Sequence, residues 1–377
     1  MTAQLLLDPL PIDTPRVLFD VTRLLRRRDQ PFGTGVDRID LAIGRDLVAR
    51  FGEACGFVHS TLLGPSLLPH AFGAALLEAL VKRWRGESDP APSALPALAR
   101  GLARRMPESW RIGATYVVAS HSGLPQRRGA LDRLDPGRKM RRLAYVHDLI
   151  PIDFPEYQRP ASAAAFRAYL AEFVGGGSVA FAVNSSDTGA RLRRHAVEHG
   201  WALERLDLRP PRIAAGAASP SSPPRREVAA ILADPAPFFL CVGTVEPRKN
   251  HLLLLHLWRD MAMAGNAPRL VIAGRRGWEN EMVVDMLERC PAMRGHVVEF
   301  SDLDDAEIDA LMRATRALLM PSFAEGLGVP LLEAAARGAC ALVSDLPALR
   351  EAAGPETVFL DPLDGPAWRR EIAARAQ

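Results

Sequence analysis

The sequence predicts an α/β protein made of two doubly wound domains, and three observations support this fold class. Its 377 residues are enough for about two domains of ordinary size. Short apolar runs alternate with amphipathic stretches along most of the chain, which is typical of βα units around a parallel sheet. A proline-rich stretch divides this alternation into two halves. We therefore predict an N-terminal domain over residues 1–209, a linker over 210–228 and a C-terminal domain over 229–377.

The individual elements follow from the position of the apolar runs. In the N-terminal half these runs predict strands at Arg16–Val21, Gly56–His59, Ala114–Ala119, Arg142–Val146 and Ser178–Val183. Helical periodicity predicts helices at Val36–Phe51, Ala71–Trp84, Pro160–Phe173 and Ser186–Glu198. The polar, proline-bearing residues 85–96 predict a surface loop.

The linker and the C-terminal half are treated in the same way. Five prolines exclude regular structure from the linker: Pro210, Pro211, Pro220, Pro223 and Pro224. Beyond it, strands separated by helices are predicted at Pro237–Val242, Arg269–Ala273, His296–Phe300, Ala317–Met320, Ala339–Ser344 and Thr357–Leu360.

Composition excludes several classes of protein. A hydrophobic content of 48% with 24% charged residues excludes a mainly disordered chain, and no apolar run approaches the length of a spanning helix. A net charge of +3 without a dominant basic tract predicts no nucleic-acid partner. The four cysteines lack C-x-x-C spacing, so we expect reduced, buried thiols and no zinc site. Nothing in residues 1–15 resembles an export signal, which predicts a cytoplasmic location.

In open α/β sheets ligands bind beyond the carboxyl ends of the strands, so the strand ends are where site residues are expected. After the strand that ends at Met320, Gly326 and Gly328 keep a loop open, and Glu325 and Glu333 stand on the loop and on the following helix. Because the two carboxylates lie on different elements, we expect them to have two different functions. The backbone amides near Gly326 are suited to bind a phosphate or a sugar hydroxyl. The alternative interpretation is a pair of solvated glutamates around a helix start.

A second strand end carries two cations. Gly243 turns the chain after an apolar strand, and Arg248 and Lys249 precede the next helix. Each charge-assisted hydrogen bond to phosphate contributes roughly 1.5 to 3 kcal/mol, so this pair suits a diphosphate. The chain has only three lysines, which favours a functional use of Lys249 over a merely exposed one.

The N-terminal half offers two further candidates. His147 and Asp148 leave the end of an apolar strand, where a histidine is as often structural as catalytic. A glycine loop with Gly33 and Gly35 lies between the first strand and the first helix. This loop resembles a phosphate cradle but lacks the full dinucleotide fingerprint.

Three other features have two interpretations each. The basic clusters Arg26–Arg28, Arg104–Arg105 and Arg138–Arg142 suit either anionic lipid headgroups or a solvated face. The pair Asp304–Asp305 is expected to cap a helix rather than to bind a metal. The turn Gly274–Glu281 either lines a base or phosphate pocket or is anchored by its tryptophan.

Taken together, residues 238–364 resemble the nucleotide-binding half of the family 4 retaining glycosyltransferases. Glu325 and Glu333 stand at the family's E-x7-E spacing, and the run from Gly243 to Asn250 is similar to its diphosphate segment. The resemblance implies the GT-B fold, in which two doubly wound Rossmann-like domains face a central cleft.

The resemblance also implies roles for individual residues. Arg248 and Lys249 would bind the diphosphate, Glu333 the ribose, and Glu325 with the following amides the donor sugar, which His147 would touch. The remaining residues that it places around the nucleotide are Gly33, Gly35, Gly243, Gly274, Arg275, Leu303, Gly326, Leu327 and Gly328. It implies no metal and no cofactor besides the donor substrate, because cations and helix N-termini stabilise the leaving diphosphate.

The form of the motifs is similar to mannosyl- and rhamnosyltransferases that build bacterial surface polysaccharides. This similarity predicts GDP-mannose as the donor and a saccharide or lipid-linked saccharide as the acceptor. If the basic clusters bind lipid headgroups, they predict peripheral contact with the inner face of the plasma membrane. Donors based on UDP or dTDP stay open. Two other functions also stay open: a nucleotide-sugar epimerase of the same fold and a non-catalytic nucleotide-sugar-binding protein.

Overall fold

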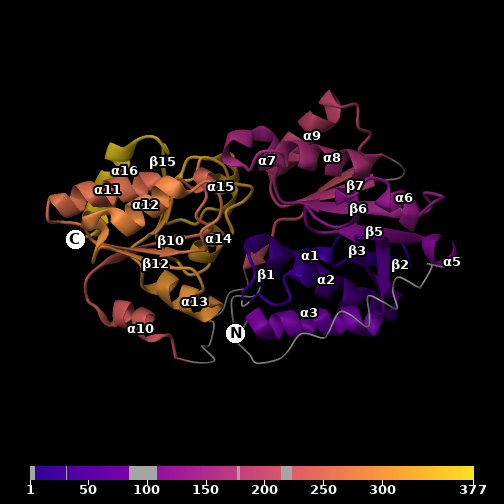
Figure 1. Ribbon diagram of the computed structural model, residues 1–377, viewed down its shortest axis with the longest axis horizontal. Coiled ribbons are helices and arrows are strands. Elements are labelled where there is room, and N and C mark those ends of the chain that lie inside the picture. The colour runs from indigo at the N-terminus through magenta and orange to yellow at the C-terminus, as the bar shows by residue number, and fades with distance from the viewer. Residues whose placement is uncertain (1–4, 31, 85–107, 176–178, 214–222) are drawn as a thin grey trace. The chain divides into compact units, whose positions relative to one another are not determined.

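The computed structural model describes residues 5–30, 32–84, 108–175, 179–213 and 223–377. The chain divides into two compact units (Figure 1). The N-terminal unit contains Leu5–Asp153 and Ala161–Arg212, and the C-terminal unit contains Phe154–Pro160 and Ile213–Gln377. The predicted boundaries assign 154–160 to the N-terminal domain, whereas the contacts of this segment group it with the C-terminal unit.

The N-terminal unit is built on a twisted, mainly parallel sheet. Among the described residues its strand order is β4-β3-β2-β5-β6-β7-β8, and only the β3–β4 pair is antiparallel. Its strands are β2 (Arg16–Asp20), β3 (Cys55–Thr61), β4 (Gly64–Leu68), β5 (Ala114–Val118), β6 (Arg141–Val146), β7 (Val179–Val183) and β8 (Arg205–Leu208). Every residue of β5 is buried, as expected where helices cover both faces of a parallel sheet.

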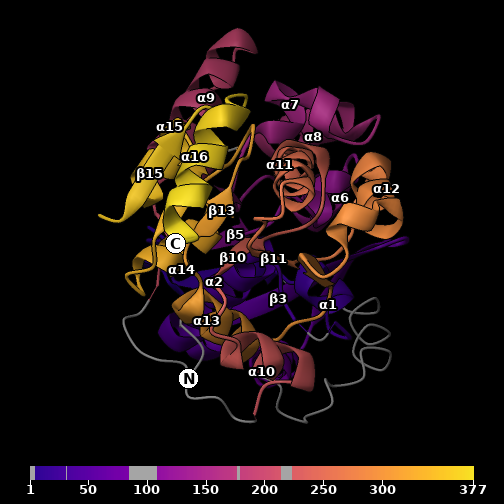
Figure 2. The same ribbon diagram turned by 90° about the vertical axis from the view of Figure 1, so that its left-hand side faces the viewer.

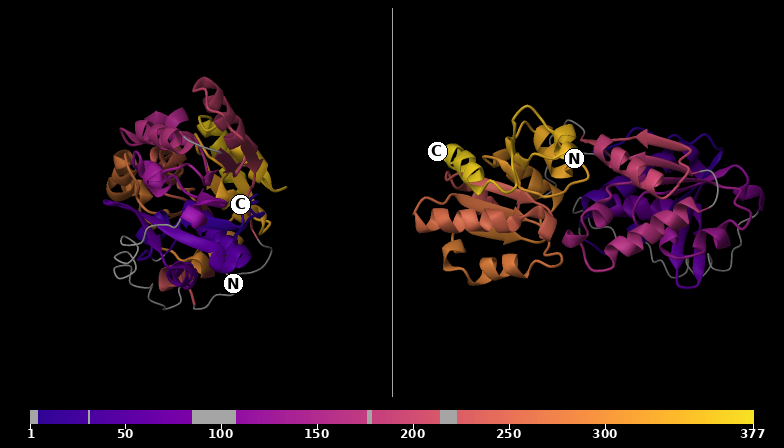
Figure 3. Two further views of the ribbon diagram at one scale, coloured as in Figure 1. Left: turned by 90° about the vertical axis from the view of Figure 1, so that its right-hand side faces the viewer. Right: turned by 90° about the horizontal axis from the view of Figure 1, so that it is seen from above.

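Helices cover both faces of this sheet (Figures 1 and 3). On one face α1 (Thr22–Arg26), α2 (Gly35–Phe51) and α3 (His70–Trp84) share a core with β2. The helices of the other face are α6 (Ala130–Leu134), α7 (Ile150–Asp153), α8 (Ser162–Val174) and α9 (Ser186–Glu198). The short α5 is Glu108–Arg111. Two two-residue strands, β1 (Leu5–Leu6) and β9 (Arg212–Ile213), pair separately.

The C-terminal unit contains an all-parallel sheet of order β12-β11-β10-β13-β14-β15 among the described residues. Its strands are β10 (Phe238–Val242), β11 (Arg269–Ala273), β12 (Val297–Phe300), β13 (Leu318–Met320), β14 (Ala341–Ser344) and β15 (Thr357–Leu360). The chain winds outward from β10 in one direction and from β13 in the other. The order therefore reverses between β10 and β13, which is where ligands bind in sheets of this type.

The helices of this unit also form two layers, and Figure 2 shows α11 and α16 above the sheet and α10 and α13 below it. One core contains side chains of α10 (Arg226–Ala233), α13 (Asp305–Ala314), α14 (Val329–Ala335) and α15 (Pro347–Ala352). The opposite core contains side chains of α11 (His251–Met263), α12 (Glu281–Arg289) and α16 (Gly365–Arg375). Short 3₁₀ helices occur in both units: η1 (Gly52–Ala54) and η2 (Leu124–Gln126) in the N-terminal unit, and η3 (Pro155–Tyr157), η4 (Pro247–Lys249) and η5 (Pro291–Met293) in the C-terminal unit.

The predicted linker differs from the structure at both of its ends. Arg212–Ile213 forms β9, and α10 begins at Arg226, although regular structure was excluded over 210–228. The two prolines before α10 stand ahead of the helix, where they remove no helical hydrogen bond. The predicted loop at 85–96 lies outside the described residues. Within the part of the chain that the structure describes, no helix is long and apolar enough to cross a membrane.

Candidate functional site

The first group of candidate residues lies at the carboxyl ends of β10 and β13, which are neighbours in the sheet. The loop after β10 carries Arg248 and Lys249 on η4, and the loop after β13 carries Glu325. These residues are 76 or 77 positions apart in the sequence, yet their side chains meet. The switch in strand order between β10 and β13 is what brings the two loops together.

Glu325 is the centre of this group. Its Oε1 accepts hydrogen bonds from Lys249 Nζ at 2.5 Å and from Ser322 Oγ at 2.7 Å, and its Oε2 accepts one from Arg248 at 2.9 Å. The same guanidinium nitrogen of Arg248 also donates to the Ala324 carbonyl oxygen at 2.9 Å. The Glu325 carboxylate thus accepts hydrogen bonds from two cations and a hydroxyl. The backbone of its own loop is also bonded to Arg248, through the carbonyl of Ala324.

This network is nearly excluded from water. The side chains of Glu325 and Lys249 are 6% and 11% exposed. A second carboxylate, Glu246, is 2% exposed and lies 2.7 Å from Arg248. Burial alone would raise the pKa of Glu325, but the charges of Lys249 and Arg248 outweigh it and lower this pKa to about 2. Glu325 is therefore ionised at neutral pH, and the two cations are balanced by two carboxylates.

The lowered pKa of Glu325 predicts a specific loss of stability in acid. A folded-state pKa below the unfolded value near 4.5 stabilises the fold above pH 4.5, and this contribution is lost as the pH falls towards 2. With a folded-state pKa of about 2, roughly 2 kcal/mol should be lost by pH 3. Denaturant unfolding of the wild type and of Glu325→Gln at pH 7 and pH 3 measures this. An equal pH dependence in both proteins would contradict the assignment.

Close contacts between backbones position the loops after β10 and β11. A Cβ atom at Gly274 would lie 1.8 Å from the Gly243 carbonyl oxygen, so only glycine fits there. Beyond this contact the Val245 N–H donates to the Arg275 carbonyl at 2.8 Å, and Gly277 donates back to Val245 at 2.9 Å. Gly243, Gly274 and Arg275, all predicted to border the nucleotide, thus belong to one paired loop structure.

The other predicted residues of this unit occupy two places. Gly326, Leu327 and Gly328 lead from Glu325 into α14, and Gly328 is the N-cap of that helix. Glu333 is half-buried within α14. Leu303 follows β12, and its side chain packs in the hydrophobic core, so that only its backbone is placed to border a ligand.

The segment Phe154–Pro160 packs against the loop that carries Glu325. The ring of Tyr157 stacks on Phe323, with the ring centroids 5.4 Å apart and the planes within 9° of parallel. The indole N–H of Trp278 donates to the Tyr157 carbonyl oxygen at 3.1 Å. Trp278 therefore acts as an anchor, which was one of the two interpretations of its turn.

In the N-terminal unit, His147 lies at the end of β6 and is 4% exposed. Its Nε2 contacts the Ala119 carbonyl oxygen at 2.7 Å and must donate to it, because a carbonyl oxygen only accepts. Burial, the neighbouring His121 and the charge of Arg23 lower the pKa of His147 to about 3. The imidazole is therefore neutral at pH 7, and its Nδ1 is left as a hydrogen-bond acceptor.

The glycine loop is part of a helix start. Thr34 is the N-cap of α2, and its hydroxyl accepts from the Asp37 N–H while the Asp37 carboxylate accepts from the Thr34 N–H at 2.8 Å. Gly35 is the first residue of the helix. A Cβ atom at Gly33 would lie 2.8 Å from the ring of Trp84, so a close ring contact accounts for this glycine.

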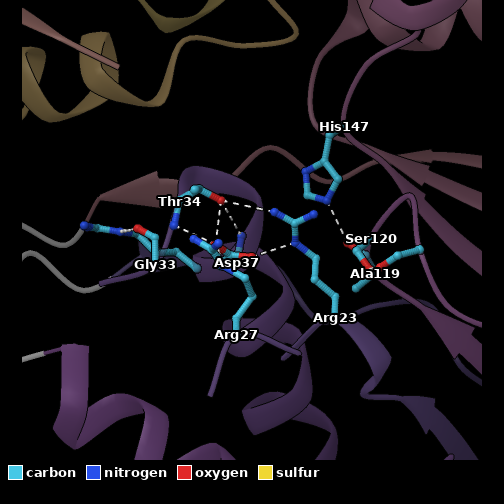
Figure 4. Close-up of polar contacts among 10 residues, drawn as sticks. Arg23, Arg27, Gly33, Thr34, Asp37, Ala119, Ser120 and His147 are labelled. Atoms are coloured by element: carbon cyan, nitrogen blue, oxygen red, sulfur yellow. Dashed lines mark hydrogen bonds and ion pairs between the residues drawn. The ribbon is translucent and has the colours of Figure 1, made fainter. Parts of the chain in front are cut away.

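Two arginines beside the loop were not predicted as site residues (Figure 4). Arg23 donates to Asp37 at 2.6 Å and Arg27 donates to the other oxygen of Asp37 at 3.1 Å. Arg23 also donates to the Thr34 hydroxyl at 3.3 Å. Two guanidinium groups share one buried carboxylate, so this group of side chains keeps an excess positive charge. The Thr34-x-x-Asp37 capping pattern was the sequence signal that could have indicated it.

The basic clusters are mostly ion-paired where they are described. In Arg138–Arg142, the side chain of Arg142 is buried and donates to the carbonyl oxygens of Glu172 and Phe173, and Arg141 pairs with Asp13. Arg142 therefore presents no charge to solvent, while Arg138 and Arg141 are exposed, and the lipid interpretation of this cluster stays a prediction. Arg104–Arg105 lies outside the described residues.

The expectation about capping is confirmed, and the expectation of buried thiols is confirmed for two of the four cysteines. Asp304 is the N-cap of α13 and forms a capping box with Glu307. All four cysteines are unpaired, with Cys55 and Cys241 buried and Cys290 and Cys340 half-buried. One group of side chains with metal-ligand chemistry is found in the described residues, and it consists of His195, Glu198 and His199, none of which is among the predicted donor-binding residues.

Comparison with known proteins connects this geometry to a family. Residues 226–371 match the family model described as Glycosyl transferases group 1. The serotype-specific mannosyltransferase WbdA of Escherichia coli is 32% identical over 118 residues, which are 31% of this chain and 14% of that protein. The O-antigen chain mannosyltransferase B of Escherichia coli is 33% identical over 141 residues, 37% of each chain. The similarity thus spans well under two thirds of either relative.

Similarity of structure extends over more of the chain. Anabaena Alr3699/HepE, solved in complex with UDP-glucose, superimposes with a TM-score of 0.61 at 12% identity, covering 95% of this chain and 89% of that one. Identity this low establishes the fold alone. The fold is GT-B, as the resemblance in the sequence implied.

Proposed function

Since residues 226–371 match the family model of the group 1 glycosyltransferases, we propose that this protein is a retaining glycosyltransferase. It transfers a hexose from a nucleotide sugar to a saccharide or lipid-linked saccharide in the synthesis of a surface polysaccharide. The observation that carries this proposal is the buried contact of Glu325 with Lys249 and Arg248 at the switch point of the matched domain. The two relatives described above are named as mannosyltransferases, which favours mannose from GDP-mannose as the transferred sugar.

The diphosphate is proposed to bind at Lys249 and Arg248. An ammonium group has three N–H donors, and one of them bonds Glu325 in the contacts described above, so Lys249 can add a phosphate oxygen without releasing Glu325. Charge-assisted bonds from these cations stabilise the negative charge that develops on the leaving nucleoside diphosphate. In this mechanism the residues supply the charge that a divalent metal supplies in other transferases.

Glu325 is proposed to orient the donor sugar rather than to act as an acid. Its pKa of about 2 keeps the carboxylate ionised, so it accepts hydrogen bonds from sugar hydroxyls and cannot donate a proton at neutral pH. Glu333 is assigned to the ribose hydroxyls, and the neutral His147 accepts a hydrogen bond from the sugar through Nδ1. The acceptor hydroxyl attacks the front face of the sugar while the leaving phosphate takes its proton, which retains the anomeric configuration.

The N-terminal unit contributes a second cationic group. Arg23 and Arg27 share the single carboxylate of Asp37 beside the glycine loop. The excess positive charge suits an anionic group of the donor or of a lipid-linked acceptor. A phosphate carried by either substrate would be held there by the same charge-assisted bonds.

A thermal-shift and turnover screen over GDP-, UDP- and dTDP-sugars tests the proposal, with each sugar measured in EDTA and in Mg²⁺. A ligand at 100 times its dissociation constant stabilises its protein by about 2.7 kcal/mol. We expect GDP-mannose to give the largest shift, equal in both buffers, and the product to retain its anomeric configuration by NMR.

Each of the other possible outcomes of the screen would contradict a different part of the proposal. A larger shift with UDP-glucose would discard the donor assignment and keep the transferase. Release of a free epimer without transfer to an acceptor would indicate an epimerase, and binding without turnover a non-catalytic protein. A shift that requires Mg²⁺ would show that Lys249 and Arg248 do not replace a metal.

A further inference from the structure

The C-terminal end of α9 carries three side chains with metal-ligand chemistry, outside every role proposed above: His195 and Glu198 in its last turn and His199 as its C-cap residue. His195, Glu198 and His199 stand at positions i, i+3 and i+4, which places them on one face of the helix. One ligand atom of each residue lies within 4.8 Å of those of the other two. Glu198 and His199 are exposed, so an ion from solution reaches the group directly.

Hydrogen bonds set the tautomer of both histidines. His195 Nε2 contacts Asp153 Oδ1 at 2.7 Å, and His199 Nδ1 contacts the His195 carbonyl oxygen at 2.9 Å. Carboxylates and carbonyls accept, so the hydrogen of each neutral ring lies on these nitrogens. The other nitrogens, His195 Nδ1 and His199 Nε2, then carry the lone pairs. Metal-binding histidines are held in this way, with the second N–H bonded to a carboxylate or a backbone carbonyl.

A second observation that indicates a metal site is the environment of His195 Nδ1. His195 is 9% exposed, and its Nδ1 is buried without a hydrogen-bond partner among the described residues. This atom faces Glu198 Oε2 at 3.5 Å. Two ligands about 2.0 Å from a tetrahedral zinc ion lie about 3.3 Å apart, so an ion fits between these atoms with little movement.

We propose that His195 Nδ1, the Glu198 carboxylate and His199 Nε2 bind a zinc ion, with water at the fourth position. Two imidazoles and one carboxylate are a ligand set that zinc uses, whereas magnesium and calcium prefer oxygen ligands alone. The ion stands at the C-terminal end of α9, where the helix dipole favours positive charge. Through His195 and Asp153 it links the last turn of α9 to the end of α7.

The test is titration of the purified full-length protein with Zn²⁺ alone, followed by calorimetry. His199→Ala and Glu198→Gln alter exposed side chains, so both variants should fold. His256→Ala, an exposed histidine on α11, is the matched control. We expect one zinc ion per chain in the wild type and in His256→Ala. In His199→Ala the dissociation constant for zinc should rise by more than roughly 10- to 100-fold, which is the cost of losing a residue that only hydrogen-bonds to a metal ligand.

A spectrum distinguishes this site from binding to thiols. With Co²⁺ in place of Zn²⁺, nitrogen and oxygen ligands give visible bands without the thiolate charge-transfer band that Cys290 or Cys340 would add. Unchanged zinc affinity in His199→Ala, a thiolate band, or no binding by the wild type at micromolar Zn²⁺ would overturn the proposal. In the last case the group consists only of the contacts of His195 with Asp153 and Glu198, without a bound metal.

Discussion

Replacing Lys249 with alanine is expected to weaken binding of GDP by about 2 to 3 kcal/mol, near a hundredfold. The variant loses charge-assisted bonds to the diphosphate in a place that is nearly closed to water. It also leaves Glu325 with one cation fewer, so that a less compensated carboxylate repels the incoming phosphates. Calorimetric titration with GDP measures the effect.

The chain provides a matched control for this substitution. Lys139 is 40% exposed and pairs with Glu108, so Lys139→Ala removes the same charge without touching the proposed site. The double variant Lys249→Ala with Glu325→Gln separates the two causes, because it removes the repelling carboxylate together with the cation. An unchanged dissociation constant in folded Lys249→Ala would remove Lys249 from the diphosphate site.

Glu325→Gln is expected to lower kcat by about a hundredfold, or roughly 2.7 kcal/mol of barrier, while the affinity for GDP changes much less. Glutamine keeps the volume of the side chain, but it loses the charge that holds the sugar hydroxyls. It also frees Lys249 and Arg248 from their shared carboxylate, which favours the nucleotide. Initial rates over a range of donor concentrations, combined with GDP titration, separate the two effects.

Glu246→Gln is the matched control, because Glu246 is also buried and also pairs with Arg248, and it is not proposed to contact the sugar. Its kcat should fall far less. Glu333→Ala, on α14, should mainly raise the donor KM, as expected for a contact with the ribose. If Glu325→Gln instead weakened GDP binding more than it lowered kcat, the roles of Glu325 and Glu333 would be exchanged while the fold stayed as described.

The bounds of several strands and helices could be predicted from the sequence because their residue patterns are local. Arg269–Ala273 and Thr357–Leu360 are strands with the predicted bounds, and Ser186–Glu198 is a helix with the predicted bounds. The additional strands β4 and β8 lie at the two edges of the N-terminal sheet. One contains a glycine and a proline and the other alternates with charges, so neither has the apolar run of a central strand.

Residues of the proposed sites were missed where their contacts come from distant parts of the sequence. Arg23 belongs to the glycine loop only because α1 packs beside the start of α2. Glu246 adjoins the predicted cations, and nothing in the sequence distinguishes it from a solvated glutamate. The H-x-x-E-H spacing of α9 is visible in the sequence, but the tautomers that make it a candidate site depend on Asp153, 42 residues away.

The sequence by itself determined the fold class, the central strands of both sheets and the loops on which Glu325, Arg248 and Lys249 lie, because periodicity and glycine placement act over a few residues. Only the tertiary structure decided that these three side chains form one buried network. That contact depends on β13 pairing with β10 rather than with β12, the strand before it in sequence. Pairing between distant strands is selected by the burial of whole faces of the sheet, and no short stretch of sequence encodes it.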